Sequence, residues 1–309
     1  MKAAIYKRYG PPEVFQLADI EKPKPKNNEI LVKIYASTVS AGALLARAGR
    51  HPNSRFFTLA IRLIFGLTKP RNPILGFEFS GEVESAGKDT KEFKKGDKIY
   101  GTTTGMHSGA YAEYICLPGN RKQGVIASKP ENLSDEDAAA VPIGGMTALD
   151  LLNKANIEKG QNVLIYGASG SVGTFAVQLA KHHFGAEVTG VCSASNLNLV
   201  QSLGADFVID YTEENFTQNG RTYDVVFDAV GKISSSYAKN SLGKNGKFIT
   251  VKSPTKEKYE YLILLKELIE KDKIKPVIEK RYPLSQIVEA HRYCDQGHKQ
   301  GNVIITMDI

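Results

Sequence analysis

The chain contains little cysteine. Its 309 residues include three cysteines, Cys116, Cys192 and Cys294, and each is far from the other two in the sequence. No pair has the spacing of two metal ligands, and no regular pattern of cysteines suggests a disulfide framework. The sequence therefore predicts neither a fold held by disulfides nor a metal site built from cysteines.

Long apolar runs are also missing. No stretch reaches the roughly 18 consecutive apolar residues of a membrane-spanning helix. The N-terminal stretch, residues 1–10, has an apolar run that is too short for a secretory signal peptide. We therefore expect a cytoplasmic protein.

Positive charge is in excess but is not concentrated. The formal net charge is +7, and the densest group of cations, residues 22–26, is interrupted by prolines. A nucleic-acid-binding surface usually combines clustered cations with aromatic residues, and no such stripe is visible. We interpret the charge as a solvated surface that also suits an anionic cofactor, and we predict no nucleic-acid partner.

The length and composition suit a globular protein of two domains, with 42% apolar and 24% charged residues. The first third reads as β-rich, with strands expected at 2–6, 29–36, 76–83, 95–100 and 109–116. From residue 162 strands and helices alternate, which predicts an α/β unit with a parallel sheet covered on both faces. The expected strands there are 162–166, 187–192, 207–209, 223–229 and 246–251, and the expected helices are 134–152, 172–183, 195–203 and 234–242. After residue 253 the pattern changes, and this tail is predicted to return to the first domain.

The most informative stretch is Asn162–Ala180. A short apolar strand is followed by three glycines, Gly167, Gly170 and Gly173, and then by apolar residues at helical spacing. A strand, a glycine turn and a helix form the context in which such glycines bind a dinucleotide. The glycines permit a tight turn, close approach to a pyrophosphate and close helix packing, and the helix N-terminus attracts the phosphates. The alternative is a glycine-rich turn without a ligand.

The stretch 55–68 is unusual because it is apolar, carries two arginines and lies between prolines. It suits a helix that lines a pocket, a lid or a membrane-surface segment. We expect it to be buried against the rest of the protein, because exposed apolar patches are uncommon.

Eight motifs together resemble the medium-chain dehydrogenase/reductase superfamily, in its zinc-free quinone-reductase branch, over nearly the whole chain. They are A-S-x-V at 36–39, G-x-E-x-x-G-x-V at 76–83, K-x-G-D at 94–97, GAYAEY at 109–114, AAAVPIGGMTAL at 138–149, GASGSVGTFAVQLAK at 167–181, the stretch 191–211 and YDVVFDAVG at 223–231. The resemblance implies a discontinuous, GroES-like, β-rich catalytic domain at 1–121 and 253–309. It also implies a Rossmann domain, doubly wound around a parallel sheet, at 122–252, an active-site cleft at their junction, and a homodimer.

The chain departs from the zinc-dependent members of this superfamily. Ser40 and Phe77 stand where those members have a cysteine and a histidine, and the four-cysteine lobe is missing. A catalytic zinc needs three nitrogen, sulfur or oxygen ligands from the protein, so no metal is predicted. Relatives without zinc commonly have asparagine and an acidic residue at the positions of Ser40 and Ala43. The segment after Val251 is also some two dozen residues shorter than in similar proteins.

The second strand of the Rossmann unit predicts the choice of cofactor. NAD-preferring domains place a carboxylate at its end, but no Asp or Glu occurs between Glu187 and Asp206. Ser193, Ser195 and Asn196 can donate to a 2′-phosphate, which favours NADPH; alternatively these groups simply cap the next helix. The resemblance adds Tyr211 beside the adenosine. The full set of predicted cofactor residues is Gly167, Ala168, Ser169, Gly170, Ser171, Val172, Gly173, Ser193, Asn196, Tyr211, Val230 and Val251.

The candidate catalytic residues are Ser40, His51 and Thr147. Ser40 and His51 are candidate donors to a substrate carbonyl, and His51 lies where related enoyl thioester reductases have a tyrosine. The alternative interpretation of His51 is a histidine in an exposed loop. Thr147 matches a threonine near the nicotinamide in similar proteins, and its alternative is helix packing.

The predicted function is an NADPH-dependent, zinc-independent reductase that transfers hydride to quinones or α,β-unsaturated carbonyls. The alternatives are a metal-free alcohol or carbonyl oxidoreductase and a non-catalytic NADPH-binding sensor. The sequence does not name the substrate, because the loops 50–70 and 102–109, which are expected to shape the pocket, follow no readable rule.

Overall fold

The protein is described by a computed structural model that covers residues 1–103, 108–119 and 124–307. The chain divides into two compact units, residues 1–142 with 278–309 and residues 143–277. Residues 122–142, predicted for the Rossmann domain, fall in the first unit, because β7 (Ile126–Ser128) pairs with β5 (Lys98–Thr102). Residues 253–277 fall in the second unit, which holds α8 (Tyr259–Glu270).

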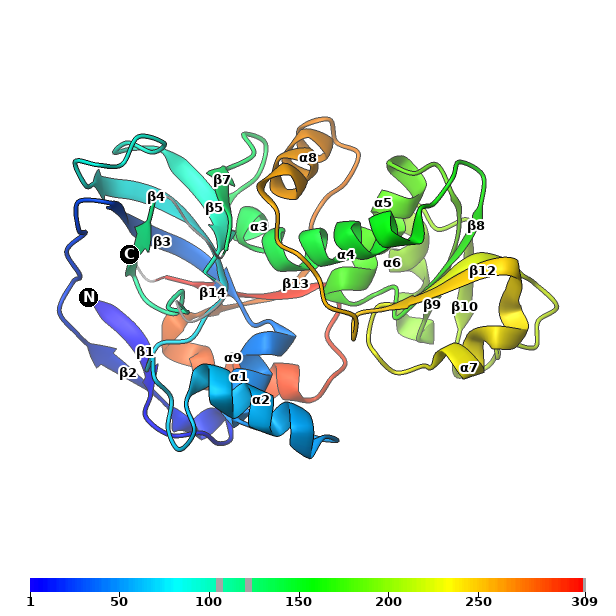
Figure 1. The fold of residues 1–309 in the computed structure, drawn as a ribbon, viewed down its shortest axis with the longest axis horizontal. Coiled ribbons are helices and arrows are strands. Elements are labelled where there is room, and N and C mark those ends of the chain that lie inside the picture. The colour runs from blue at the N-terminus through cyan, green and yellow to red at the C-terminus, as the bar shows by residue number, and fades with distance from the viewer. Residues whose placement is uncertain (104–107, 120–123, 308–309) are drawn as a thin grey trace. The chain divides into compact units, whose positions relative to one another are not determined.

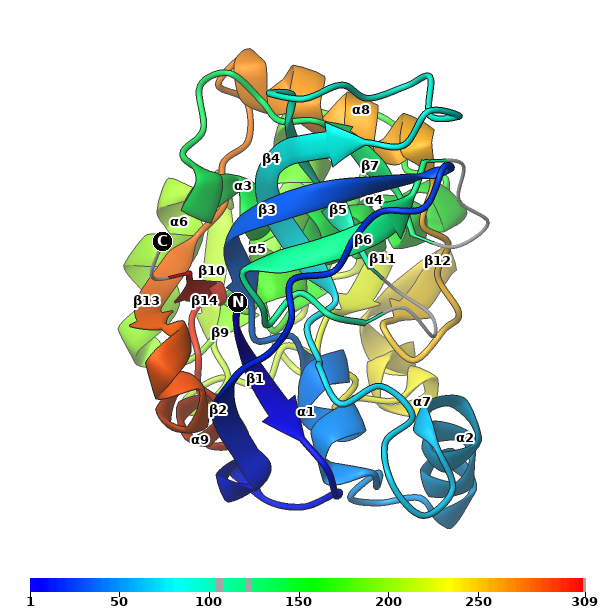
Figure 2. The same ribbon diagram turned by 90° about the vertical axis from the view of Figure 1, so that its left-hand side faces the viewer.

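The first unit is built on a mixed sheet in the order β13-β14-β3-β4-β5-β7, with β6 also paired to β3 (Figures 1 and 2). The remaining bounds are β3 Glu29–Thr38, β4 Glu78–Ala86, β6 Tyr114–Pro118, β13 Ile278–Pro283 and β14 Asn302–Thr306. β3 is buried along most of its length, because β4, β6 and β14 all pair with it. The C-terminal strand therefore completes a sheet that the N-terminal part begins.

The rest of the first unit surrounds this sheet. A separate hairpin pairs β1 (Lys2–Tyr6) with β2 (Phe15–Asp19) in antiparallel register. The helices are α1 Ala41–Ala48, α2 Arg55–Phe65, α3 Asp135–Ala139 and α9 Ile287–Asp295, with 3₁₀ turns at Pro12–Val14 and Leu284–Gln286. The prediction of one helix over 134–152 is wrong, since α3 ends before a break and α4 (Pro142–Ala155) starts at a proline, which is favoured at the first helical position.

The second unit holds a parallel sheet of five strands in the order β10-β9-β8-β11-β12. The strands are β8 Asn162–Tyr166, β9 Glu187–Cys192, β10 Phe207–Asp210, β11 Tyr223–Asp228 and β12 Leu242–Thr250. The helices are α4, α5 Ser171–His182, α6 Leu197–Ser202, α7 Ser235–Ala238 and α8, with 3₁₀ turns at Ala194–Asn196 and Lys239–Ser241. In chain order this is the 3-2-1-4-5 arrangement of a Rossmann sheet.

The prediction of a GroES-like β-rich unit and a Rossmann unit is confirmed. One helix of the second unit was predicted wrongly. The helix expected over 234–242 is only α7 and a 3₁₀ turn, because Leu242 already pairs with Tyr223 and a register shift follows. Among residues 124–307 the sheet has five strands, so the sixth strand of the usual Rossmann order is not formed, and the chain passes from β12 to α8 through residues 251–258.

Candidate functional site

The carboxyl ends of the five parallel strands carry the predicted cofactor residues. The turn 167–170 follows β8, and Ser193, Tyr211, Val230 and Val251 lie just beyond β9, β10, β11 and β12. In sheets of this kind a ligand binds outside the carboxyl ends, where the strand order reverses. The order reverses between β8 and β11, so the structure brings these residues to the edge where a dinucleotide is expected.

The glycine turn leaves no room for side chains on its protein side. Gly167 has φ of +80°, and the N–H groups of Gly167 and Ala168 donate to Val191 O at 2.9 and 3.0 Å. A Cβ on Gly173 would lie 2.1 Å from Gly167 O, so this glycine allows α5 to approach the turn. A Cβ on Gly170 would meet only Gly167 O at 3.5 Å, which leaves the turn open on that side. This cradle fits a phosphate group.

The start of α5 adds an attraction for negative charge. The helix begins at Ser171, its N-cap Gly170 has no side chain to accept from the helix, and no acidic residue lies in the first turn. A helix N-terminus of this kind has donors available and a partial positive charge. Ser171 and Val172 are half-buried there, and the stretch 168–173 thus combines donors with a close backbone approach.

Hydroxyl and amide groups form a cluster at the end of β9. Asn196 Nδ2 donates to Ser169 Oγ at 3.1 Å and to Ser193 Oγ at 3.0 Å, and Ser195 Oγ lies 3.3 Å from Ser193 Oγ. Asn196 is 6% exposed, and its Oδ1 is buried without a partner among the residues that the structure describes. A half-turn of the amide lets the hydroxyls donate to Oδ1 and frees an N–H for a ligand. The cluster fits a further anion or a set of ribose hydroxyls.

A carboxylate that the sequence analysis did not consider lies close to this cluster. Asp210 pairs with Cys192 in the register of β10 and β9. Burial, and then the charge of Asp210, raise the pKa of the Cys192 thiol to about 11. Asp210 Oδ1 accepts from the Thr212 N–H at 3.0 Å and from its hydroxyl at 2.8 Å, so the carboxylate is turned into its own loop. The sequence signal for cofactor choice concerns the end of the second strand, whereas Asp210 lies at the end of the third.

Asp228, at the end of β11, fixes the loop that carries Val230. Its side chain is fully buried. Its Oδ1 accepts from the N–H groups of Val230, Gly231 and Lys232 at 3.3, 2.9 and 3.2 Å. Its Oδ2 accepts from the Ile233 N–H at 3.3 Å and from the Thr250 hydroxyl at 3.1 Å. The Val230 methyl groups consequently press against Gly167, where a Cβ would lie 2.5 Å from one of them.

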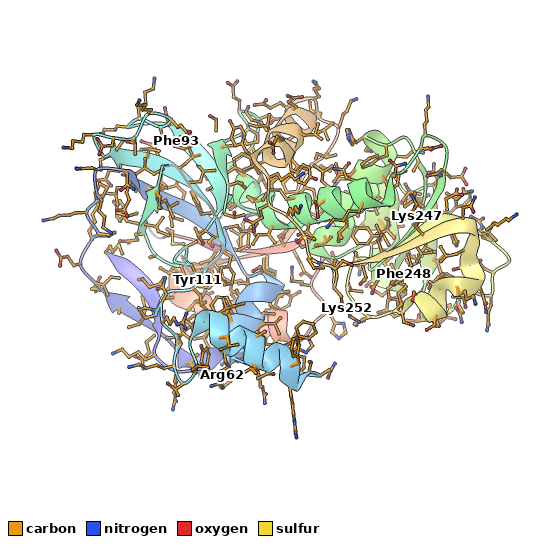
Figure 3. All side chains as sticks on the ribbon, viewed as in Figure 1. Arg62, Phe93, Tyr111, Lys247, Phe248 and Lys252 are labelled. Carbon is orange, nitrogen blue, oxygen red and sulfur yellow. The ribbon has the colours of Figure 1, made fainter. Side chains whose placement is uncertain are left out.

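Asp228 belongs to the motif at 223–231, and its positioning role was not predicted. Lys252, at the neighbouring end of β12, is exposed (Figure 3). A Cβ on Gly231 would lie 3.2 Å from the Lys252 side chain.

An exposed aromatic ring lies beside the end of β9. Tyr211 is 50% exposed, its N–H donates to Cys192 O at 3.1 Å, and its ring lies 6.4 Å from that of Tyr166. A flat, partly exposed ring of this kind suits stacking against a base.

The three candidate catalytic residues are divided between the two units, with Ser40 and His51 in the first and Thr147 in the second. Ser40 is the N-cap of α1, and its Oγ accepts from the Ala43 N–H at 3.3 Å. His51 is half-buried, its Nδ1 accepts from the Asn53 N–H at 3.3 Å, and its own N–H donates to Thr58 Oγ1 at 2.9 Å. Thr147 is half-buried on α4 and belongs to the other unit. Ser40 therefore has a structural role that the sequence analysis did not foresee.

The positions that hold zinc ligands in other members have different surroundings here. Phe77 is 6% exposed, packs near Gly42 and lies 5.8 Å, ring to ring, from Phe65. Within residues 1–103, 108–119 and 124–307, no group of three or more His, Cys, Asp or Glu side chains is placed to hold a metal ion. Glu78 next to Phe77 is buried and accepts a hydrogen bond from the Thr38 hydroxyl.

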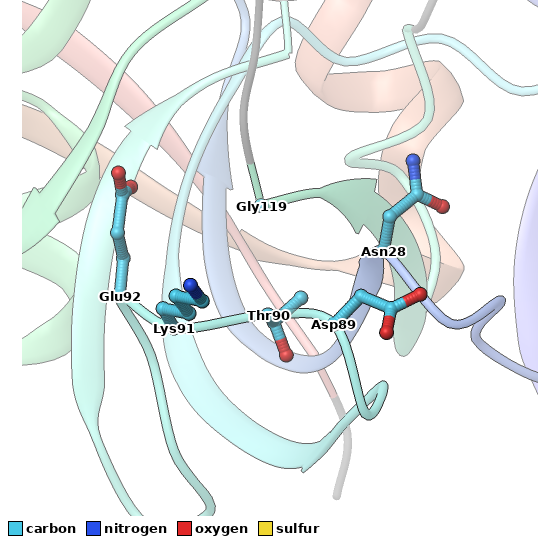
Figure 4. Close-up of a pocket in the computed structure, with 6 residues that line it drawn as sticks. All are labelled: Asn28, Asp89, Thr90, Lys91, Glu92 and Gly119. Carbon is cyan, nitrogen blue, oxygen red and sulfur yellow. The ribbon is translucent and has the colours of Figure 1, made fainter.

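A pocket of about 190 Å³ opens elsewhere on the first unit, between Asn28, Asp89, Thr90, Lys91, Glu92 and Gly119 (Figure 4). None of these residues was predicted to act, and the pocket lies on loops away from Ser40 and His51. Of the loop predicted to shape the substrate pocket, residues 104–107, with His107, lie outside the described residues. No helix in the described part of the chain is long and apolar enough to cross a membrane.

Family models match most of the chain. The alcohol dehydrogenase GroES-like domain matches residues 26–128, and two zinc-binding dehydrogenase models match residues 171–273 and 255–305. The chain therefore belongs to the medium-chain dehydrogenase/reductase superfamily. Within it, the relatives and solved structures that match place the chain in the quinone oxidoreductase-like branch.

Two relatives and one solved structure illustrate this placement. The 2-methylene-furan-3-one reductase of Solanum lycopersicum is 32% identical, over 99% of this chain and 79% of the relative. The chloroplastic NADPH-dependent alkenal/one oxidoreductase of Arabidopsis thaliana is 30% identical, over 99% and 79%. The quinone oxidoreductase structure from Coxiella burnetii matches with a TM-score of 0.83 at 30% identity, over 99% of both chains.

Proposed function

We propose that this protein is an NADPH-dependent reductase that delivers hydride to quinones or α,β-unsaturated carbonyls without zinc. The observation that carries the proposal is the glycine cradle at the switch point of the parallel sheet, where Gly170 leaves space for a phosphate. The printed activities of the relatives, reductases of quinones and of activated alkenes, support the choice of acceptor.

The choice of NADPH over NADH rests on the cluster at the end of β9. Asn196, Ser193 and Ser195 offer amide and hydroxyl groups where NAD-preferring domains have a carboxylate. The carboxylate of Asp210, at the end of the neighbouring strand β10, accepts two hydrogen bonds from Thr212 and so is less available to ribose hydroxyls. One relative is named for the same cofactor.

The nicotinamide, when bound, supplies the hydride. The chain therefore has to bind the cofactor and the acceptor, orient them and exclude water. The residues 167–173 bind the pyrophosphate, and Asp228 sets the position of Val230 beside the turn. Reduction of an enone also needs a proton donor near the carbonyl oxygen. Because His51 Nδ1 accepts from Asn53 N–H, the proton of the neutral ring lies on Nε2, from which it can be donated. The Ser40 hydroxyl retains its hydrogen for the same purpose.

The deciding experiment follows NADPH oxidation at the nicotinamide absorbance with 1,2- and 1,4-quinones and with a series of enals and enones, and NADH is run in parallel. Turnover with NADPH well above that with NADH supports the proposal, and the faster acceptor class identifies the substrate chemistry. Tight cofactor binding without turnover of any acceptor would instead favour a sensor. Oxidation of simple alcohols by NADP⁺, unchanged by a metal chelator, would favour a metal-free alcohol oxidoreductase.

A further inference from the structure

The helix α2 contacts the protein through Thr58, Arg62 and Phe65 and turns a row of apolar side chains to the solvent. The sequence analysis expected residues 55–68 to be buried, and this prediction is wrong because no residue of α2 is buried. A surface helix of a globular protein normally turns its apolar stripe toward the core. We propose that α2 and the cations around it form a docking surface for a membrane whose lipids carry negative charge.

The orientation of α2 is fixed by specific contacts on its inner side. Arg62, labelled in Figure 3, donates from Nε to Gly49 O at 2.8 Å. Its guanidinium lies 4.5 Å from the centre of the Tyr9 ring. Thr58 Oγ1 accepts from the His51 N–H at 2.9 Å. Because these polar groups are engaged by the protein, the helix cannot roll to hide its apolar side without breaking them.

The outer side of α2 is a continuous apolar stripe. Phe56, Leu59 and Leu63 follow one another at i, i+3 and i+7, so they lie on one face. Their exposed fractions are 76%, 54% and 54%. Phe57 and Ile64 flank the stripe and are 54% and 49% exposed. Scattered apolar residues on a surface need no explanation, but a contiguous patch of this size indicates an interaction site.

The charge around this stripe selects the partner. No Asp or Glu occurs between Glu29 and Glu78, so the stretch of chain that contains α2 has no negative side chain. Exposed cations lie just before, at the start of and after the helix: Arg50, Arg55, Lys69 and Arg71. Arg55 occupies the first turn of α2, where the helix dipole favours an acidic residue, so helix stability alone does not explain it.

Aromatic and aliphatic side chains on one face, with arginine and lysine at the border, are the features of helices that lie in the membrane interface. The apolar side chains enter the boundary of headgroups and acyl chains, and the cations stay at the level of the anionic headgroups. An apolar partner without negative charge would not be attracted by the cations around α2. This docking surface does not depend on the proposed reaction, and vesicle binding is measured without activity.

The test sediments the full-length protein with vesicles of phosphatidylcholine alone and with vesicles of equal parts phosphatidylcholine and phosphatidylglycerol. We expect binding to the anionic vesicles, weakened by salt, and little binding to the neutral ones. Leu59→Ser with Leu63→Ser should abolish binding, whereas Leu17→Ser, which changes an exposed leucine of β2, should leave it unchanged.

A matched pair of triple variants separates local charge from net charge. Each cation close to an anionic surface strengthens binding about fivefold. Arg50→Gln, Arg55→Gln and Lys69→Gln together should therefore weaken binding more than tenfold. Lys24→Gln, Lys88→Gln and Lys95→Gln remove the same charge from exposed positions elsewhere and should have a small effect. Equal losses in the two variants would overturn the proposal.

The chain has no tryptophan, which allows a second measurement that needs no loss of function. In a Phe56→Trp variant, fluorescence should shift to the blue when anionic vesicles are added, and in a Leu17→Trp variant it should not. No shift at Phe56 would overturn the proposal. A dimer that becomes monomeric on Leu59→Ser with Leu63→Ser, without vesicle binding by the unaltered protein, would instead assign the face to a second copy. A raised KM for the acceptor without vesicle binding would assign it to the substrate.

Discussion

Arg47 and His291 form a buried pair that joins α1 to α9. Arg47 Nη1 lies 3.3 Å from His291 Nδ1, and the two side chains are 4% and 0% exposed. Tyr111 donates its hydroxyl hydrogen to Thr38 O at 3.0 Å, so at 3.3 Å it accepts from His291 Nε2. Nδ1 then accepts from the guanidinium, which also binds Asp295 at 2.8 Å. The imidazole is therefore held neutral.

This pair makes the stability of the protein fall in mild acid. Burial, and then the charge of Arg47, lower the pKa of His291 well below its usual 6.5. Below pH 6.5 the unfolded chain therefore binds a proton that the folded chain excludes, and the free energy of unfolding falls by up to about 1.4 kcal/mol per pH unit. Above that pH this contribution is constant. Urea unfolding between pH 8 and pH 5 should show the slope.

In a His291→Gln variant the free energy of unfolding should change less steeply with pH, even if the variant is less stable at every pH. His298→Gln changes an exposed histidine and should keep the slope of the unaltered protein. An equal slope in all three proteins would contradict the neutral assignment of His291.

Asp228→Asn should weaken cofactor binding through the loop 229–233. Asparagine keeps one acceptor oxygen, but its amide would face the Ile233 N–H and the Thr250 hydroxyl, which now donate to Oδ2. The hydrogen bonds on one side of the loop are then lost, which destabilises the bound conformation of the loop by about 1–3 kcal/mol. We expect the KM for NADPH to rise at least tenfold while kcat changes less.

The matched control is Asp224→Asn, at the opposite end of β11. Asp224 accepts from the Asn162 N–H at 2.8 Å, away from the cofactor edge. This variant should leave the KM for NADPH unchanged. Equal effects of the two variants would show that Asp228 contributes only stability.

The two glycines of the turn should respond to alanine in opposite ways. In Gly173→Ala the new Cβ would lie 2.1 Å from Gly167 O, so the helix must move and stability should fall by about 3 kcal/mol. In Gly170→Ala the Cβ meets nothing closer than 3.5 Å, so stability should change by less than about 1 kcal/mol. In Gly170→Ala the added methyl group occupies the space for the phosphate, so the affinity for NADPH should fall more than tenfold. Calorimetry and titration of cofactor fluorescence measure the two effects.

Ser193→Asp should shift the preference toward NADH. A carboxylate at the end of β9 accepts from ribose hydroxyls and repels a 2′-phosphate. The ratio of kcat/KM for NADPH to that for NADH should fall about a hundredfold, or about 2.8 kcal/mol. Ser202→Asp introduces the same charge on the exposed end of α6 and should leave the ratio unchanged. A fall of similar size in both variants would mean that long-range charge decides the preference.

The sequence predicted features that depend on local chemistry. Gly167 and Gly173 make close approaches that only glycine permits. The apolar run before them is short enough for a buried strand, so turn, strand and helix follow from neighbouring residues. The five carboxyl-end positions follow in turn from the alternation of strand and helix. The assignment of roles to these residues stays a prediction.

Other features depend on contacts between distant segments. The orientation of α2 is set by Gly49 O and by the Tyr9 ring, and no periodicity within residues 55–68 reveals which side they hold. Asp210 belongs beside Cys192 only because β9 and β10 pair in that register. The role of Asp228 depends on the path of the loop 229–233, and the motif at 223–231 does not predict that path.

The pairing of β14 with β3 sets the order in which the chain can fold during synthesis. All strands of the second unit lie between residues 162 and 250, so this unit is complete while the ribosome still holds the last part of the chain. The first unit lacks β13 and β14 until residues 278–306 emerge. Until then, the edge of β3 that pairs with β14 stays unpaired. The pairing of β14 with β3 closes a loop of most of the chain, and contacts so far apart in sequence form slowly. Chaperone dependence of this protein should consequently concentrate on residues 1–142, and truncation of the last strand should trap a folded Rossmann unit attached to an incomplete one.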